Sequence, residues 1–233
     1  MISVVIPAYN EERNLPATVA ALRMLPEVDE IVVVDDGSAD GTGSVAEELG
    51  CRVVRFARNQ GKGAALTAGA RAANGDILVF LDADLGASAA EARRLLSPVM
   101  AGEADMVIGC LPSARRPGGL GLVKTLAAAG VRWLAGMPAT AALSGQRALR
   151  RAVLEAVGEL SAGFGVEVGL TIDAARAGFR VLEVPVAMHH RETGRDVRGF
   201  LHRGRQLVHV CRALARRAMR RVAERVTNRV PLP

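Results

Sequence analysis

The sequence predicts a Rossmann-like α/β fold, in which a mostly parallel central sheet is covered by helices on both faces. Apolar runs of four to six residues alternate with segments of helical character, which is the pattern of parallel strands buried between helices. Half of the residues are hydrophobic and only 3% are aromatic, so Val, Leu, Ile and Ala must build the core. With 233 residues, the chain can bury a sizeable core in one large domain or in a domain with a helical appendage.

Each element is expected from its own local signals. Asn14 is the expected cap of the first helix, and Gly50 closes the second. Residues 61–63 open an Ala-rich third helix that ends near Asn74 and Gly75. The apolar runs predict strands at residues 2–6, 30–34, 51–56, 76–81, 106–109 and 179–186. The expected helices are residues 14–24, 61–74 and 88–100, with a further helix that runs through residues 46–49.

Acidic side chains follow three of these strands, at the point where each strand ends. Residues 7–12 end in two glutamates, residues 35–38 begin with two aspartates, and Asp82 and Asp84 come directly after a buried strand. Parallel strands bring their carboxyl ends to one edge of the sheet, where ligands bind in such folds. Carboxylates gathered there repel one another unless a cation or sugar hydroxyls occupy the site. The pattern predicts a divalent cation and the phosphates that it neutralises.

Two common phosphate-binding loops are excluded by their spacing. A dinucleotide-binding loop needs Gly-x-Gly-x-x-Gly after the first strand, where this chain has Pro-Ala-Tyr-Asn. A P-loop needs Ser or Thr after its lysine, whereas Lys62 is followed by Gly63. Phosphates at this edge must therefore be held by a cation and by side chains.

Four motifs, in order, carry a resemblance to a known family. They read Val-Ile-Pro-Ala-Tyr-Asn-Glu-Glu, Val-Val-Asp-Asp-Gly-Ser, Asn-Gln-Gly-Lys-Gly and Phe-Leu-Asp-Ala-Asp. This set resembles the GT-A glycosyltransferases of family 2, close to the polyprenyl-phosphate glucose and mannose synthases. The resemblance is strong to about residue 110 and weaker from 110 to 195. It implies a GT-A domain over residues 1–196, with a nucleotide-sugar half (1–110) and an acceptor half (111–196), before a basic helical tail (197–233).

The resemblance implies roles for residues after the first two strands. Pro7, Ala8, Tyr9 and Glu11 would line the base and ribose of the nucleotide. Asp36 would lie beside them and accept hydrogen bonds from the base or ribose. A packing role would explain Tyr9 as well.

The resemblance also implies roles around the central pair of aspartates. Asp84 would ligate Mg²⁺ or Mn²⁺ bridging the diphosphate, and Asp82 would hold the ribose or the same metal, with Ala83 between them in the nucleotide site. The cation would stabilise the leaving nucleoside diphosphate as a Lewis acid. Lys62 would contact the nucleotide or set its loop, since a lysine at a helix N-terminus is unfavourable without an anion nearby.

One departure from the family pattern concerns a further metal ligand. Some relatives carry a Gln two residues after the second Asp, where this chain has Gly86. His189 or His190 is a candidate replacement, because other GT-A enzymes bring a His to the metal from this part of the chain. An exposed pair of loop histidines is the alternative.

The acceptor half suggests basic groups for a phosphate-bearing acceptor. Arg115 lies in a basic, glycine-rich loop, and arginine can contact a phosphate through two hydrogen bonds. Ser144 and Arg147 belong to Ser-Gly-Gln-Arg, which resembles a Ser-Gly-Phe-Arg segment near the acceptor phosphate in the family, although a solvated helix start would explain them equally well. Arg191 and Arg195 could clamp the diphosphate as a loop closes.

Glu167 is the best candidate for a general base. Inverting transferases that act on a hydroxyl need such a base, normally an acid near this place in the family. A phosphate acceptor is already anionic and needs no base, in which case Glu167 would only organise the site.

The tail carries most of the positive charge. Residues 191–229 hold twelve arginines against three acids, whereas the rest of the chain holds 18 basic and 21 acidic residues. Apolar residues spaced by three and four from about residue 197 to 226 predict a cationic amphipathic helix. It would dock on the catalytic domain or lie on an anionic membrane. Nucleic acid is disfavoured as a partner, because aromatic residues for base stacking are scarce.

The chain is expected to be a cytoplasmic protein, in part at the inner face of the membrane. Its three cysteines are scattered, its first residues lack a basic leader, and no apolar run approaches the roughly 20 residues of a membrane span. The predicted function is metal-dependent, inverting transfer of a hexose from UDP-glucose or GDP-mannose to a polyprenyl phosphate. The alternatives are transfer to a soluble phosphorylated acid, as in glucosyl-3-phosphoglycerate synthases, and a sugar-nucleotide-binding or scaffold protein without turnover.

Overall fold

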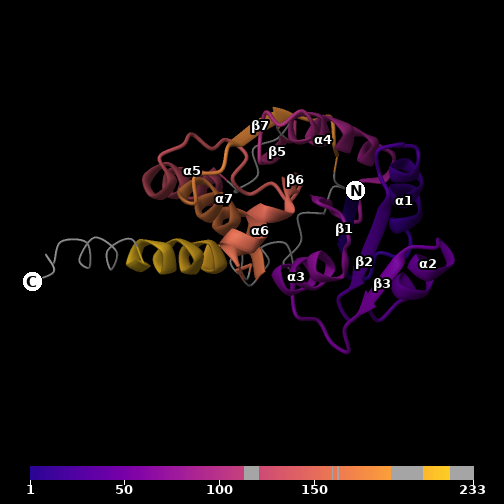
Figure 1. Ribbon diagram of the computed structural model, residues 1–233. Coiled ribbons are helices and arrows are strands. Elements are labelled where there is room, and N and C mark those ends of the chain that lie inside the picture. The colour runs from indigo at the N-terminus through magenta and orange to yellow at the C-terminus, as the bar shows by residue number, and fades with distance from the viewer. Residues whose placement is uncertain (113–120, 159, 162, 190–206, 221–233) are drawn as a thin grey trace, which may run out of the picture.

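The computed structural model describes residues 1–112, 121–158, 160–161, 163–189 and 207–220 (Figure 1). Its centre is a seven-stranded sheet in the order β3-β2-β1-β4-β6-β5-β7. β6 runs antiparallel to both its neighbours, β4 and β5, and every other pair is parallel. The predicted mostly parallel α/β sheet is confirmed.

The elements have the following bounds. The strands are β1 Ile2–Ala8, β2 Glu30–Asp35, β3 Arg52–Arg55, β4 Ile77–Phe80, β5 Met106–Cys110, β6 Arg147–Arg150 and β7 Val181–Pro185. The helices are α1 Leu15–Arg23, α2 Thr42–Glu48, α3 Lys62–Ala72, α4 Ala92–Met100, α5 Gly121–Ala135, α6 Arg151–Val157 and α7 Val166–Arg176, and short 3-10 turns cover η1 Gly86–Glu91 and η2 Gly163–Gly165.

Two expectations need correction. The helix expected over residues 88–100 begins as the 3-10 turn η1, and only α4 is α-helical. The segment around Arg147 is not a solvated helix start, because Arg147 is the first residue of the buried strand β6. The strands predicted from apolar runs and the helices α1, α2 and α3 agree with the structure within about two residues.

Helices cover both faces of the sheet because successive strand residues point to opposite sides. Val4 and Ile6 of β1 pack in a cluster with residues of α1, α2 and α4. Val5, between them, packs in a second cluster with residues of α3, α6 and α7. The sheet therefore has no solvent-exposed face at its centre, which explains the near-continuous apolar character of its strands.

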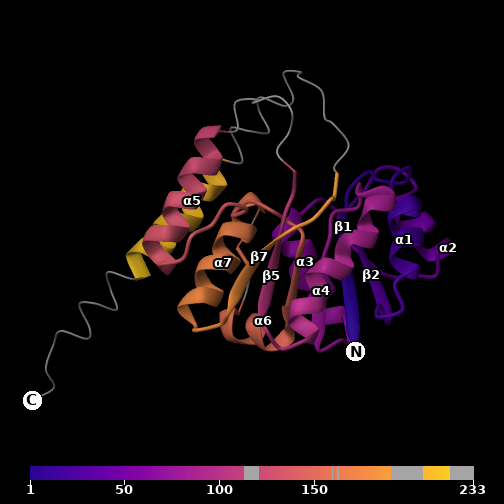
Figure 2. The same cartoon turned by 90° about the horizontal axis from the view of Figure 1, so that it is seen from above.

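Residues 207–220 form a helix that packs against α5 and α7 through a third apolar cluster. Figures 1 and 2 show this gold helix beside α5, at the end of the molecule opposite α2. Val210 is fully buried, and Arg217 donates from Nε to Asp173 Oδ1 at 2.8 Å. Gly130 of α5 makes room for Leu214, since a Cβ at that position would overlap its side chain. This part of the predicted tail is thus a docked element of the domain.

Within the described residues, no helix combines the length and the apolar character needed to cross a bilayer.

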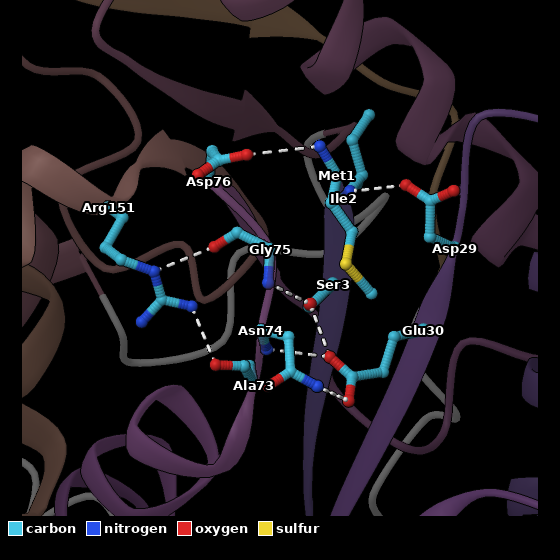
Figure 3. Close-up of polar contacts among 10 residues, drawn as sticks. All are labelled: Met1, Ile2, Ser3, Asp29, Glu30, Ala73, Asn74, Gly75, Asp76 and Arg151. Carbon is cyan, nitrogen blue, oxygen red and sulfur yellow. Dashed lines mark hydrogen bonds and ion pairs between the residues drawn. The ribbon is translucent and has the colours of Figure 1, made fainter.

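A polar network ties the N-terminal ends of β1, β2 and β4 together, at the edge opposite the acidic loops (Figure 3). Glu30 accepts hydrogen bonds from Ser3 Oγ (2.6 Å) and from the backbone N–H of Asn74 (2.9 Å). Arg151 donates from Nη2 to the carbonyl of Ala73 (2.8 Å), at the C-terminal end of α3, where a cation is favourable. The network holds the strands in register below the site.

Glu30→Gln is expected to lower the free energy of unfolding by about 1–2 kcal/mol at pH 7. Burial alone would raise the pKa of Glu30, but hydrogen bonds from Ser3, Asn74 and Arg52 and the Arg52 charge lower it below its ordinary 4.5. A depressed folded-state pKa gives stability that is present above the ordinary pKa and is lost as the pH falls through the folded-state pKa. Urea denaturation should therefore show the Glu30→Gln deficit shrinking toward pH 3. Glu48→Gln, at an exposed position of α2, is the control, and an equal deficit in both variants would contradict the assignment.

Candidate active site

Topology brings five segments to one edge of the sheet. The parallel strands β1, β2 and β4 end there, and α3 begins there after β3. Because β6 is antiparallel, its first residue, Arg147, pairs with Phe80, the last residue of β4. The loop that precedes β6 therefore meets the loop that follows β4, which carries Asp82 and Asp84.

A lysine between two acids forms the centre of this edge. Lys62 Nζ lies 2.6 Å from Asp82 Oδ1 and 3.1 Å from Glu167 Oε1. The Lys62 side chain is 22% exposed and that of Glu167 only 8%. Burial alone would lower the pKa of Lys62, but the carboxylates of Asp82 and Glu167 outweigh it and hold the pKa above its ordinary value. Lys62 is therefore a permanent cation that joins α3, the loop after β4 and the first turn of α7.

Gln146, the residue before β6, holds Asp82 from the other side. Its Nε2 donates to Asp82 Oδ2 at 2.6 Å, and the backbone N–H of Asp82 donates to Gln146 Oε1 at 3.1 Å. Gln146 has no exposed surface. Both carboxylate oxygens of Asp82 are thus engaged by protein groups.

Further acids surround this pair. The pKa of Glu11 is raised, first by burial and then by the negative charges of Asp84, Asp40 and Asp82, although a hydrogen bond from Asn14 opposes the rise. Such mutual repulsion marks an edge with excess negative charge, as the sequence predicted. A cation at this edge would relieve it.

The nucleotide-lining residues predicted from the first two strands divide into two groups. Tyr9 is 48% exposed and Pro7 is partly exposed, so both present surface to a ligand. Ala8 is 2% exposed and packs in the core. Asp36 is 4% exposed, and its two carboxylate oxygens accept from the backbone N–H groups of residues 60 and 61 at 2.7 and 2.9 Å. Asp36 therefore shapes the loop that carries Lys62, and its contact with base or ribose stays a prediction.

The comparisons with known proteins agree with this geometry. Residues 3–156 match the family model described as glycosyl transferase family 2. This chain is a family 2 glycosyltransferase.

Two curated relatives resemble this glycosyltransferase over most of their length. Polyprenol monophosphomannose synthase of Mycolicibacterium smegmatis is 39% identical, over 82% of this chain and 78% of the relative. Undecaprenyl-phosphate mannosyltransferase of Micrococcus luteus is 36% identical, over 82% of this chain and 84% of the relative. The predicted family is therefore confirmed.

Solved structures of a third protein share the fold. Glucosyl-3-phosphoglycerate synthase of Mycobacterium tuberculosis, in complex with Mn²⁺, UDP and phosphoglyceric acid, matches with a TM-score of 0.78 and 31% identity. The match covers 93% of this chain and 78% of that one. Another structure of the same enzyme, with Mg²⁺ and UDP, matches equally well over 93% and 79%. The GT-A fold predicted for this glycosyltransferase is confirmed.

The acceptor-side prediction for Arg147 is not supported by its surroundings. Arg147 is 1% exposed and donates from Nε to the carbonyl of Ser144 (2.9 Å) and from Nη1 to Thr171 Oγ1 (2.9 Å). Burial lowers the pKa of its guanidinium to about 10, against the opposing charges of Glu167 and Glu183, so it is still charged at neutral pH. In this glycosyltransferase, Arg147 braces the loop before β6 from inside the fold.

The predicted metal ligands are not assembled as a set. Among the described residues, no three His, Cys, Asp or Glu side chains converge on one point. Asp82 is engaged by Lys62 and Gln146, while His189 is exposed, with its backbone N–H donating to Ser88 Oγ at 3.1 Å. Between Asp82 and Asp84, Ala83 is 4% exposed, and its carbonyl accepts from Thr18 Oγ1.

Four predicted residues, Arg115, His190, Arg191 and Arg195, lie outside the described residues of this glycosyltransferase.

Sequence reasoning missed the role of Gln146 and the partners of Lys62. Gln146 stands where the family resemblance suggests an aromatic residue, so the departure itself was the available signal. The link from Lys62 to Glu167 had no local signal, because it depends on how α7 packs beside α3.

Proposed function

We propose that this glycosyltransferase moves a hexose from UDP-glucose or GDP-mannose to a polyprenyl phosphate, with inversion and with Mg²⁺ or Mn²⁺. Two relatives that match this chain over most of their length support the proposal, because their names state a polyprenol or undecaprenyl-phosphate mannose reaction. Within the site, the observation that favours a phosphate acceptor is the ion pair between Lys62 and Glu167.

The acceptor class follows from what Glu167 can do. The Glu167 side chain is 8% exposed and its Oε1 lies 3.1 Å from Lys62 Nζ, so the protein itself already engages this carboxylate in an ion pair. An acceptor hydroxyl would need a strong base at this place, whereas a phosphate oxygen is already anionic and attacks without losing a proton. The pairing therefore favours the phosphate acceptor, with Glu167 and Lys62 organising the site.

The residues at this edge fit a divalent cation. Mg²⁺ is commonly bound through one or two carboxylates together with substrate phosphates and water, so a preassembled set of three protein ligands is not required. Asp84 would hold the cation, and the neighbouring acids, which add to the effect of burial in raising the pKa of Glu11, favour positive charge there. When bound, the cation supplies Lewis-acid stabilisation of the leaving diphosphate.

The chain's own groups would orient both substrates. Tyr9, which is half exposed, offers a ring face to the base, and the loop held by Asp36 presents the N-terminus of α3 toward the phosphates. Arg115, Arg191 and Arg195 would hold the acceptor phosphate and the diphosphate through paired N–H groups. The acceptor oxygen attacks the anomeric carbon from the face opposite the diphosphate, which inverts the configuration.

Glu167→Gln is expected to reduce transfer to a polyprenyl phosphate by no more than about tenfold. Loss of a required general base costs about 10²–10⁴-fold, so the two acceptor classes predict clearly different results. Transfer of radiolabelled sugar into organic-extractable product measures the rate. Glu155→Gln, at an exposed position of α6, is the control, and a loss beyond a hundredfold specific to Glu167→Gln would make Glu167 a base.

A second candidate acceptor is a soluble phosphorylated acid. The likeness to glucosyl-3-phosphoglycerate synthase over 93% of this chain favours it, since that enzyme was solved with phosphoglyceric acid. Transferred label that stays in the aqueous phase and requires phosphoglyceric acid would establish this alternative.

Peripheral contact with an anionic membrane, at the cytoplasmic face, belongs to the same proposal. On the helix at residues 207–220, Arg212, Arg216 and Arg220 are exposed, and the outward side also carries Val208 and Met219. Cations beside exposed apolar side chains suit an anionic lipid surface.

Replacing Arg212, Arg216 and Arg220 together by Gln is expected to lower binding to phosphatidylglycerol vesicles at least about tenfold, since each cation near such a surface contributes roughly 1 kcal/mol. Substitution is preferred to deletion, because deletion would expose the core that this helix covers. Co-sedimentation measures binding, with the Gln variant of three exposed arginines on and after β3 as control: Arg52, Arg55 and Arg58. Equal binding of the two triple variants would refute the assigned surface.

A further inference from the structure

Gln146 makes an unusual double contact with a single residue. Its amide oxygen accepts from the backbone N–H of Asp82 at 3.1 Å, and its amide nitrogen donates to Asp82 Oδ2 at 2.6 Å. The side chain is fully buried, so water cannot replace either hydrogen bond, and losing them would cost the free energy of leaving a buried amide unsatisfied. One neutral group therefore fixes both the backbone and the carboxylate of Asp82.

The position of Gln146 is itself fixed by the sheet. Its carbonyl accepts from the backbone N–H of Gly109 at 2.8 Å, beside the pairing of β5 with β6. The neighbouring Gly145 leaves room for the ion pair, because a Cβ there would overlap Lys62 Nζ and lie 3.2 Å from Asp82 Oδ2. Gly145 and Gln146 together form the surface that the Lys62–Asp82 ion pair packs against, which we call the wall of the site.

The charges around Asp82 explain why an amide suits this wall. Lys62 holds Oδ1, while Glu167, Glu11 and Asp84 add negative charge nearby. An apolar side chain at position 146 would leave Oδ2 and the backbone N–H of Asp82 without these two bonds, and a glutamate would place another carboxylate against Oδ2. A glutamine supplies one donor and one acceptor without adding charge.

We infer that Gln146 is a positioning residue for sugar transfer: it locks the Asp82 carboxylate onto Lys62 and thereby leaves the divalent cation to Asp84. The inference rests on the proposed function, because it assumes that a cation and a nucleotide bind at this edge. It pairs Asp82 with the ammonium group of Lys62 and Asp84, two residues later, with the divalent metal ion.

A double-mutant cycle tests whether Gln146 acts through Asp82. The variants are Gln146→Leu, Asp82→Ala and the two combined, and the readout is calorimetric binding of UDP and of GDP in the presence of Mn²⁺. Gln146→Leu is expected to weaken the binding about tenfold in the wild-type background and less than about twofold in the Asp82→Ala background. The KM for the sugar nucleotide should rise about tenfold, with kcat changed less than threefold.

Two further variants separate positioning from folding. Gln146→Met keeps a flexible side chain of similar length without the amide and should match Gln146→Leu, whereas Gln146→Glu should weaken Mn²⁺–UDP binding more than either. Urea midpoints taken on all variants show which of them are folded. The inference would be overturned, with the proposed function left standing, by unchanged affinity in Gln146→Leu and Gln146→Met. It would also be overturned if the loss of affinity in the double variant equalled the product of the losses in Gln146→Leu and Asp82→Ala. Wild-type protein that binds neither nucleotide would overturn the proposed function, and the inference with it.

Discussion

Asp84→Ala is expected to lower the rate of sugar transfer by at least about a thousandfold, which corresponds to roughly 4 kcal/mol of transition-state stabilisation. The carboxylate oxygens of Asp82 are engaged by Lys62 and Gln146, so Asp84 is the aspartate after β4 that we assign to the cation. Removing it would take away the hard oxygen ligand and the negative charge that we propose for holding the cation. The loss should appear in kcat as well as in the affinity for Mn²⁺.

The measurement is transfer of radiolabelled sugar from UDP-glucose and GDP-mannose, with Mn²⁺ titrated in parallel. Asp76→Ala is the matched control, because Asp76 precedes the same strand at its opposite end and its side chain is 86% exposed. An Asp84→Ala variant within tenfold of the control would exclude Asp84 as the main ligand. A wild-type protein that binds nucleotide sugars but neither transfers nor hydrolyses them would instead be a binding protein.

The fold was predictable where local patterns carry the information. Strands such as Glu30–Asp35 are apolar runs, and helix starts and stops have glycine or asparagine signals. Strand β6 had no such signal, because it is four residues long with an arginine at each end. Its burial depends on the carbonyl of Ser144, three residues before Arg147, and on the hydroxyl of Thr171 in α7, which is 24 residues away in sequence. A buried cation with internal partners cannot be recognised from its neighbours in sequence.

The site was predictable as an edge but not as a set of contacts. Parallel strands had to bring the loops with Glu11, Asp36 and Asp84 together, and the pKa of Glu11 is raised first by burial and then by neighbouring acids that include Asp84. Asp36 points inward to the loop before α3 because the backbone N–H groups of residues 60 and 61 need hydrogen-bond acceptors there. Docking of residues 207–220 likewise depends on gaps left by Gly130 and Gly165, which no periodicity in the tail encodes.

Lys62→Met is expected to impair stability and transfer together. It leaves the carboxylates of Asp82 and Glu167, whose side chains are 25% and 8% exposed, without their shared cation. Breaking a largely buried pair by removing one partner typically costs about 3–5 kcal/mol, and partial exposure of Asp82 reduces this to about 2–4 kcal/mol here. Sugar transfer should fall at least about a hundredfold, because Asp82 and Glu167 would both lose their fixed position at this edge of the sheet.

The pH dependence and a compensating substitution show that the lost charge is the cause. The folded-state pKa of Lys62 lies above its ordinary 10.5, so its stabilisation is present in full below that pH and is lost only as the pH rises through the folded-state value. The deficit of Lys62→Met in urea denaturation should therefore be constant from pH 6 to about pH 9. Adding Glu167→Gln should restore part of the stability, since it removes one uncompensated negative charge, whereas Lys124→Met, at an exposed position of α5, should change stability by less than about 0.5 kcal/mol. A Lys62→Met variant as stable as Lys124→Met would mean that solvent, and not Lys62, balances the two acids.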